Sequence, residues 1–340
     1  MLLIYFINMK ATAKAHSNIA LIKYWGKRDE ELVLPHNSSI SFTIDKFHTI
    51  TTVEFSKKYK KDILIINDKE YSHDSSEYIE YVAKFLDTVR NISDNKLHVK
   101  IVSNNNFPKG AGLASSASAF AALAIAIDSA LSLKLSKKEL SILARIGSGS
   151  ASRSIHGGIV KWHKGQSEHG EDSFAEQLHD QNHWQEIKII FCITDTSEKK
   201  IKSRVGMKRT VETSPKYVEW LETVDDDIDK IELALTHKDF TLLGKTAEKN
   251  CLKMHNTMHT SKPPIIYQNP TTLIIMKKVR ELRHKGIECY FTMDAGPQVK
   301  IITQDKNVKL IEDEIKKLND VQIIVSGIGP DAKIIDEHLF

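Results

Sequence analysis

The 340-residue sequence has few cysteines, which argues against several classes of protein. Its three cysteines, Cys192, Cys251 and Cys289, stand far apart and lack the paired spacing of a metal site. A small, odd number of cysteines indicates a reducing compartment rather than a disulfide framework. We therefore expect a cytoplasmic protein.

Long apolar runs and strong net charge are also lacking. The N-terminal apolar run Leu2–Ile7 has no basic lead and no small-residue cleavage site, so it predicts neither a signal peptide nor a membrane span. A formal net charge of +4 is too small to indicate nucleic-acid binding. We expect small-molecule partners, with no nucleic acid and no membrane.

The remaining composition, 41% hydrophobic and 27% charged, is that of an ordinary globular protein. A chain of this length more often forms two associated domains than one. β-rich runs such as Ser39–Ile44 and His48–Phe55 dominate the first half, and long amphipathic helices the second. We predict an α+β fold with domains over 9–186 and 187–340 and the active site between them.

Local patterns predict individual elements. Further strands are expected over Ala11–Ala15, Ile63–Ile66, Leu97–Ser103, Ile159–Trp162, Ile187–Thr194, Glu288–Asp294, Val299–Thr303 and Val321–Ser326. Helices are expected over Glu77–Arg90, Phe120–Leu131, Lys137–Ile146, 197–212, 215–235, 239–258, 270–285 and Asn307–Leu318. The polar stretch 163–185 is expected to be a surface excursion near the domain boundary.

The most informative segment is Phe107–Ala119, in which two glycines precede a serine cluster and an alanine-rich helix. A helix start presents unpaired N–H groups and positive dipole character, so it suits a bound phosphate. The segment lacks a Gly-Lys-Ser/Thr ending, and Ser115 stands where a dinucleotide fingerprint has Gly or Ala. A simple Gly-Ser helix cap is the alternative, but the loop length and the serines favour a phosphate cradle.

The segment Ala15–Arg28 places cationic and aromatic residues beside a glycine, directly after a strand. Lys23 and Lys27 are candidates for binding phosphate as point charges, and Tyr24 is a candidate hydrogen-bond donor. The alternative is an amphipathic loop with exposed lysines.

Two more segments carry candidate functional groups. Gly147–Ser154 alternates glycine and serine and contains Arg153, a composition that suits a rigid turn binding an oxyanion. Asp294 ends an apolar strand and begins a Gly-Pro turn, which is both a common catalytic position and a routine turn position. Ser203 and Arg204, where another helix begins, are further candidates for anion contacts, with a solvated helix face as the alternative.

Two other site types are not expected. Cys251, His255 and His259 share one helical face, but without an acidic partner nearby such a stripe indicates packing rather than a metal site. The sequence also lacks a Ser-His-Asp spacing signature, and Ser150 lacks the strand–elbow–helix context of a nucleophilic serine.

Taken in order, the four segments resemble the GHMP family of small-molecule kinases, and within it the diphosphomevalonate decarboxylases. Pro108–Ala117 matches the family's phosphate loop Pro-x-x-x-Gly-Leu-x-Ser-Ser-Ala, and Asn18–Lys27 matches Asn-Ile-Ala-x-x-Lys-Tyr-Trp-Gly-Lys. Gly147–Ser154 matches Gly-Ser-Gly-Ser-Ala-x-Arg-Ser, and Met293–Pro297 matches Met-Asp-Ala-Gly-Pro. Kinases of the same superfamily share the serine loop but not the Tyr-Trp-Gly-Lys segment.

The resemblance implies ATP-dependent decarboxylation of mevalonate 5-diphosphate to isopentenyl diphosphate, with ATP as co-substrate and Mg²⁺ as metal. It also implies the GHMP kinase fold, with an N-terminal domain like domain 2 of ribosomal protein S5 and a ferredoxin-like C-terminal domain, and a homodimer. A kinase that stops at a 3-phosphate, or one that prefers another form of mevalonate, remains an alternative. A non-catalytic nucleotide- or RNA-binding protein is a second.

Site roles follow from the resemblance and from the chemistry of the side chains. Asp294 is expected to orient or deprotonate the C3 hydroxyl, Lys27 to keep Asp294 ionised, and Arg153 to grip the substrate carboxylate. Substrate binding is expected from Tyr24, Lys27, Ser148, Gly149, Ser150, Arg153, Ser203, Arg204, Met207, Asp294 and Ala295. ATP binding is expected from Asn18, Ser103, Lys109, Gly110, Gly112, Leu113, Ala114, Ser115 and Ser116, with the Ser116 hydroxyl on Mg²⁺.

Overall fold

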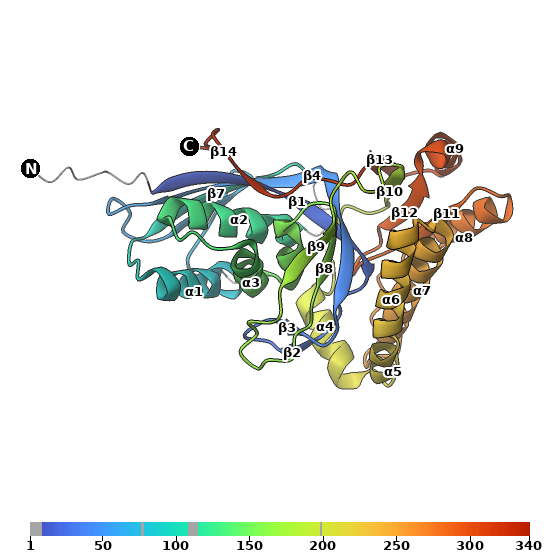
Figure 1. Cartoon of the computed structure of the whole chain (residues 1–340), viewed down its shortest axis with the longest axis horizontal. Coiled ribbons are helices and arrows are strands. Elements are labelled where there is room, and N and C mark those ends of the chain that lie inside the picture. Colours follow the sequence, from blue (N-terminus) through green and yellow to red (C-terminus); the bar gives the residue numbers. More distant parts are fainter. Residues whose placement is uncertain (1–8, 76–77, 108–114, 198) are drawn as a thin grey trace, which may run out of the picture.

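The computed structural model describes residues 9–75, 78–107, 115–197 and 199–340. Its strands form a large sheet, a smaller sheet and a short hairpin, and helices flank both sheets (Figure 1). The α+β fold class predicted from the sequence is confirmed. Within the described ranges, no helix is long and apolar enough to cross a membrane.

The large sheet is built around two long antiparallel strands, β1 (Lys10–Ile22) and β4 (Ser39–Phe55). Its order is β14-β1-β4-β7-β5-β6, while β8 pairs with the first residues of β4 and with β9. The other strands are β5 (Ile63–Ile66), β6 (Lys69–Tyr71), β7 (Val99–Asn105), β8 (Ile159–Trp162), β9 (Ala175–His179) and β14 (Lys333–Ile335). The hairpin is formed by β2 (Lys27–Asp29) and β3 (Leu34–Pro35).

Helices α1 to α3 lie on one side of the large sheet (Figure 1). The alanines of α2 (Ser115–Leu131) allow close packing, and most of this helix is buried between the sheet and its neighbours. A π-helical turn at Tyr78–Ala83 leads into α1 (Lys84–Ser93). The capping box expected from Ser136 and Glu139 starts α3 (Lys137–Gly147), which is followed by a 3-10 turn over Gly149–Ile155.

The smaller sheet has the order β11-β12-β10-β13 and two buried faces. Its strands are β10 (Ile187–Ile193), β11 (Cys289–Thr292), β12 (Val299–Gln304) and β13 (Gln322–Ser326). Along β10, Ile189 and Phe191 join the core shared with the large sheet, whereas Ile190 and Cys192 pack among residues of α8 and α9. Because both faces are covered, every residue of β10 except Lys188 is apolar.

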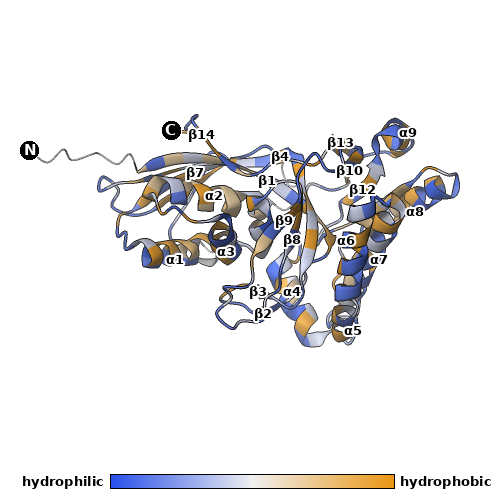
Figure 2. Ribbon diagram, in the orientation of Figure 1, coloured by the Kyte–Doolittle hydropathy of each residue, from blue (hydrophilic) through white to orange (hydrophobic). Residues whose placement is uncertain are grey.

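The second half also contributes six helices in the described ranges. They are α4 (Ser203–Thr213), α5 (Tyr217–Glu222), α6 (Val224–His237), α7 (Phe240–His259), α8 (Pro270–His284) and α9 (Asp305–Ile315). Figure 2 shows hydrophobic and hydrophilic residues alternating along the helices, as expected for helices with one buried face.

The end of the chain returns to the large sheet. After β13, Ile328 forms a bridge with Ile44, and β14 then pairs antiparallel with β1. The domain expected over 187–340 therefore contributes its last strand to the large sheet. The polar stretch 163–185 also differs from expectation, because it contains β9.

Candidate active site

A cavity of about 410 Å³ opens where β1, α2, α4 and the end of β11 converge. Described residues from all four sequence segments and from the start of α4 line its wall. Of the predicted site residues, the lining includes Asn18, Tyr24, Lys27, Ser115, Ser116, Ser148, Gly149, Ser150, Arg153, Ser203, Arg204, Met207, Asp294 and Ala295. Segments far apart in the sequence thus meet at one site.

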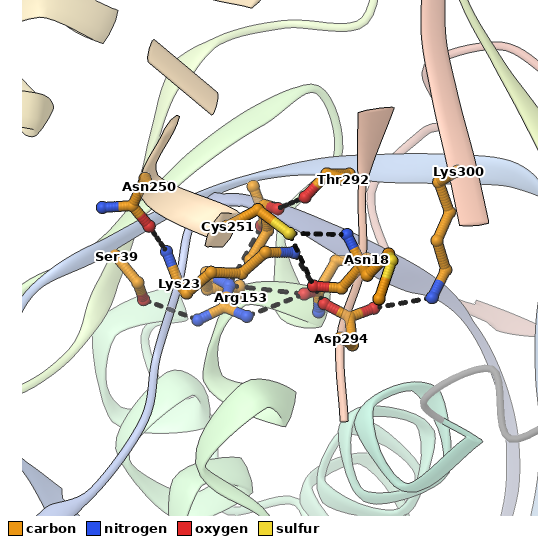
Figure 3. Close-up of polar contacts among 12 residues, drawn as sticks. Asn18, Lys23, Ser39, Arg153, Asn250, Cys251, Thr292, Asp294 and Lys300 are labelled. Atoms are coloured by element: carbon orange, nitrogen blue, oxygen red, sulfur yellow. Dashed lines mark hydrogen bonds and ion pairs between the residues drawn. The ribbon is translucent and has the colours of Figure 1, made fainter. Parts of the chain in front are cut away.

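Asp294 lies at the centre of this site, with a lysine on each carboxylate oxygen (Figure 3). Lys23 Nζ is 2.8 Å from Oδ1, and Lys300 Nζ is 3.1 Å from Oδ2. Burial alone would raise the pKa of Asp294, but the charges and hydrogen bonds of the two lysines lower it well below its usual range. The side chain is 32% exposed, so an ionised carboxylate faces the cavity.

The expectation that Lys27 supports Asp294 is wrong in this structure. Lys27 Nζ donates a hydrogen bond to Glu30 Oε2 within the β2–β3 hairpin, and Lys23 and Lys300 neutralise Asp294 instead. Burial lowers the pKa of Lys27, while the hydrogen bond to Glu30 acts in the opposite direction. Lys27 nevertheless lines the cavity, so its predicted contact with a ligand stays a prediction.

The main chain of Lys23 is fixed on both sides. Its N–H donates to Asn250 Oδ1 at 2.9 Å, and its carbonyl accepts from Asn37 Nδ2 at 2.7 Å. The amide of Asn250 also donates to Asp227 Oδ2 at 2.8 Å, which connects the end of β1 to α6 and α7. The lysine next to Asp294 is therefore held by main-chain contacts as well as by its own charge.

Arg153 is buried beside the same cavity, and hydrogen bonds to polar neighbours fix the orientation of its guanidinium (Figure 3). Its Nη2 donates to Asn18 Oδ1 at 3.0 Å, its Nε to Ser41 Oγ at 3.0 Å and its Nη1 to Ser39 Oγ at 2.6 Å. Burial lowers the pKa of Arg153 to about 10, so the guanidinium is still charged at neutral pH. These neighbours are neutral, so its charge is available to an anion in the cavity.

The Gly147–Ser154 turn is shaped by close contact with aromatic rings. A Cβ at Gly149 would come within 2.9 Å of both Tyr24 and Trp162, so only glycine allows this approach. The Tyr24 hydroxyl is buried and has no hydrogen-bond partner among the described residues. Because burial raises the pKa of Tyr24, this hydroxyl is a neutral donor in the cavity wall.

The predicted ATP contacts are only partly described. Ser115 and Ser116 begin α2 and line the cavity, and Ser116 Oγ lies 3.2 Å from Ser148 Oγ. Residues Lys109, Gly110, Gly112, Leu113 and Ala114 lie outside the described residues. The Asn18 amide is engaged by Arg153, the Ser150 carbonyl and the Ser154 hydroxyl. Ser103 is buried on β7, where its hydroxyl pairs with Thr51, so it does not reach the described cavity wall.

The start of α4 closes another side of the cavity. Ser203, Arg204 and Met207 face it, and Arg204 Nη2 donates to the Gly147 carbonyl at 2.7 Å. This contact joins α4 to the glycine–serine turn. The helix expected over 197–212 begins only at Ser203 in the structure, so Ser203 and Arg204 lie in its first turn.

Sequence reasoning missed two lysines. Lys199 lines the cavity, where burial and repulsion from Lys300 lower its pKa while Asp294 opposes them. Lys300 lies within the apolar strand β12 and contacts Asp294. A lysine in an otherwise apolar strand is a signal that a buried partner is present, and this signal was available in the sequence.

The Cys251, His255 and His259 stripe on α7 is engaged in packing and local hydrogen bonds. The Cys251 thiol lies 3.1 Å from the Met293 N–H, and Gln268 bridges the two histidine rings. Across the described part of the chain, no group of three or more His, Cys, Asp or Glu is arranged to hold a metal ion.

Comparison with known families decides among the activities that such a cavity suits. Residues 15–175 match the model of the diphosphomevalonate decarboxylase-like N-terminal domain, and residues 189–326 match the mevalonate 5-diphosphate decarboxylase C-terminal domain. The chain belongs to the diphosphomevalonate decarboxylase family. The resemblance inferred from the four segments, and the GHMP kinase-type fold it implied, are confirmed.

Decarboxylases of this family from distant organisms resemble the whole chain. The Ganoderma lucidum diphosphomevalonate decarboxylase is 36% identical over 96% of this chain and 88% of its own length. The Staphylococcus aureus mevalonate diphosphate decarboxylase structure has a TM-score of 0.90 and 44% identity, covering 96% of this chain and 98% of that one. A structure of MDDEF in complex with MVAPP, AMPPCP and magnesium has the same TM-score and identity, covering 96% and 99%. The expected enzyme class is confirmed.

Proposed function

We propose that this diphosphomevalonate decarboxylase family member performs ATP-dependent decarboxylation of mevalonate 5-diphosphate in the described cavity. The products are isopentenyl diphosphate, carbon dioxide, ADP and phosphate. One observation carries the assignment of the site: the ionised Asp294 and the charged Arg153 face the same cavity as the serines at the start of α2. The acceptor hydroxyl and the carboxylate of the substrate can therefore be bound beside the phosphoryl donor.

Asp294 receives the C3 hydroxyl of the substrate. Its low pKa makes it an ionised hydrogen-bond acceptor that orients the hydroxyl toward the phosphoryl donor. After phosphoryl transfer, loss of phosphate from the tertiary carbon develops positive charge. The same carboxylate stabilises that charge electrostatically.

Arg153 binds the carboxylate of the substrate until carbon dioxide leaves. Its planar group suits a carboxylate, and its contacts with Asn18, Ser39 and Ser41 fix its orientation before the substrate arrives. A fixed donor lowers the entropy lost on binding and aligns the breaking carbon–carbon bond.

The diphosphate end of the substrate is assigned to the part of the cavity wall around Tyr24, Lys27 and Arg204. Tyr24 offers there a hydroxyl that has no partner among the described residues, and Arg204 and Lys27, the latter paired with Glu30, are cations in this wall. Short polar and apolar residues complete this wall: Ser148, Gly149, Ser150, Ser203, Met207 and Ala295.

The start of α2 is assigned to ATP. Ser115 and Ser116 lie at an N-terminus suited to phosphate, and the sequence pattern extends this assignment to the preceding glycine loop. Mg²⁺ fits this region because it prefers oxygen ligands and keeps phosphate and water oxygens, so the Ser116 hydroxyl is sufficient as a protein ligand. Bound there, the metal neutralises phosphate charge.

Replacement of Asp294 tests the proposal. We expect Asp294→Ala to reduce turnover on the order of 10³-fold or more, because the acceptor and charge-stabilising group is lost, with ATP binding nearly intact. The assay follows labelled carbon dioxide from 1-labelled mevalonate 5-diphosphate with ATP and Mg²⁺, and a fluorescent ATP analogue reports binding.

Asp313→Ala is the matched control, since it removes an exposed carboxylate paired with a lysine on α9. More than a tenth of the wild-type rate in Asp294→Ala would remove this residue from the mechanism. In the unsubstituted protein, ADP release without carbon dioxide would indicate the kinase alternative, and neither product would indicate a binding protein.

The proposal extends to assembly and location. A homodimer is supported by the family resemblance and by exposed apolar side chains of α7 and α8, including Leu252 and Leu273. Light scattering of the purified protein tests the homodimer, and a measured mass equal to that of a single chain would contradict it. Three free, buried cysteines support a cytoplasmic location, which cell fractionation tests.

A further inference from the structure

Lys300 reaches the active-site carboxylate from inside the smaller sheet. It lies on β12 between the core residues Val299 and Ile301, and its side chain is only 2% exposed. A lysine so deeply buried is costly unless its charge is paired. Its ammonium is paired with Asp294, at 3.1 Å from Oδ2 (Figure 3).

Sheet geometry fixes this ion pair. Thr292 on β11 is the register partner of Lys300 on β12, and Asp294 follows Thr292 by two residues. Lys300 and Asp294 therefore approach each other within one half of the molecule. Lys23, in contrast, reaches Asp294 from the end of β1 in the large sheet.

The two lysines consequently differ in what they can control. The contact from Lys23 depends on how the two halves meet, whereas the contact from Lys300 is internal to the smaller sheet. With Lys23 on Oδ1 and Lys300 on Oδ2, the carboxylate has a defined orientation and leaves its exposed side toward the cavity. Loss of Lys300 would free Oδ2 to rotate toward Lys23 or Lys199.

We infer that Lys300 is a positioning residue for the decarboxylation, which holds Asp294 in the orientation that accepts the substrate hydroxyl. This inference rests on the role proposed above for Asp294. Lys300 does not line the described cavity wall, so it acts through Asp294 rather than on the substrate. Its removal should therefore affect turnover more than substrate binding.

The test compares Lys300→Gln with Lys300→Arg in the full-length protein. We expect Lys300→Gln to lower kcat about 10- to 100-fold, as losses of supporting hydrogen-bond partners do, with KM for both substrates within about threefold. Lys300→Arg keeps the charge and should recover most of kcat. Lys188→Gln is the matched control, because it removes a lysine and an ion pair from the neighbouring strand β10.

A double-mutant cycle separates positioning from a general structural effect. If Lys300 acts through Asp294, adding Lys300→Gln to Asp294→Asn should lower kcat by less than about a further threefold. The inference is overturned if Lys300→Gln keeps more than half of the wild-type kcat, or if its full effect persists in the Asp294→Asn background. If Lys300→Arg does not fold, the double-mutant cycle with Lys300→Gln decides whether the inference holds. Circular dichroism checks that each variant is folded.

These outcomes are distinct from failure of the proposed function. Near-normal turnover by Asp294→Asn would refute the role of Asp294 itself. A large loss of turnover in Asp294→Asn together with wild-type turnover in Lys300→Gln would refute only the positioning role of Lys300.

Discussion

Arg153 is held in place by side chains that contribute no charge. Asn18 lies on β1 and Ser39 and Ser41 on β4, so the guanidinium is fixed by the two longest strands of the large sheet. Neutral acceptors satisfy its donors without neutralising it. The orientation of this cation thus depends on hydrogen-bond geometry, which a different cation cannot reproduce.

We expect Arg153→Lys to lower kcat/KM at least about 100-fold, because lysine lacks the planar fork that can hold both neighbours and a carboxylate. Steady-state assays of carbon dioxide release check this. Arg90→Lys serves as control, since it alters an arginine paired with Asp62 away from the cavity. Equal rates for Arg153→Lys and the wild type would show that charge alone is sufficient.

Sequence patterns identified the residues at turns and helix starts better than the residues inside strands. Arg153 was predicted because it is the arginine of the glycine–serine segment Gly147–Ser154, and Asp294 because it ends an apolar strand before a Gly-Pro turn. Spacing could not distinguish Lys23 from Lys27, since the distinction arises where β1 ends and where Asn250 contacts it. The predicted ATP contact of Ser103, whose hydroxyl pairs with that of Thr51 on β4, stays a prediction.

Helix α7 supports the site mainly through contacts with other residues of the cavity wall, although its Met254 also lines the cavity. It supplies Asn250 to the main chain of Lys23 and Cys251 to that of Met293, and it buries His255 between them and α8. Burial, followed by the charge of Lys23, lowers the pKa of His255 to about 3. The helix is therefore packed around a neutral imidazole.

This histidine makes stability depend on pH. The unfolded chain binds a proton at His255 near pH 6.5 and the folded chain only near pH 3, so stability falls as pH drops through that window, by up to about 1.4 kcal/mol per pH unit. We expect His255→Gln to have a shallower decline between pH 6.5 and 4. Urea unfolding across this range measures it, with His284→Gln as control, since His284 is exposed at the end of α8. Parallel curves for the wild type and His255→Gln would contradict the prediction.

Element boundaries were predictable where the periodicity was strong. Helices α3, α7 and α8 and strands β10 and β12 lie close to their expected ranges, because caps, prolines and apolar runs mark their ends. The extension of β1 from Ala15 to Ile22 was missed, since the polar residues His16 and Asn18 pair with β4 on either side of an irregularity instead of forming a loop. Strand β14 has three mostly exposed residues and no apolar alternation to reveal it.

At the scale of the whole molecule, the two halves are joined by more than one stretch of chain. The first sheet contains residues from both ends of the described sequence, through the pairing of β14 with β1. Gly329 strengthens this return, since its N–H donates to the Thr43 carbonyl at 2.8 Å and its carbonyl accepts from Gly158 at 2.9 Å.

We expect Ile334→Pro to lower the free energy of unfolding by about 1 to 3 kcal/mol, because proline removes a main-chain donor from a strand that pairs with β1. Hydrogen exchange should show reduced protection over 12–14 and unchanged protection in β12. Ile334→Thr, which keeps the donor, is the control. Unchanged protection over 12–14 in the proline variant would show that β14 contributes little to the sheet.

The return of the chain also has a mechanical consequence. The halves are connected once between β9 and β10 and again between β13 and β14, so two separate crossings span their boundary. Both of these segments would have to extend before the two halves could move apart. The covalent path of the backbone thereby limits how the walls of the cavity can separate, before any side-chain contact is considered.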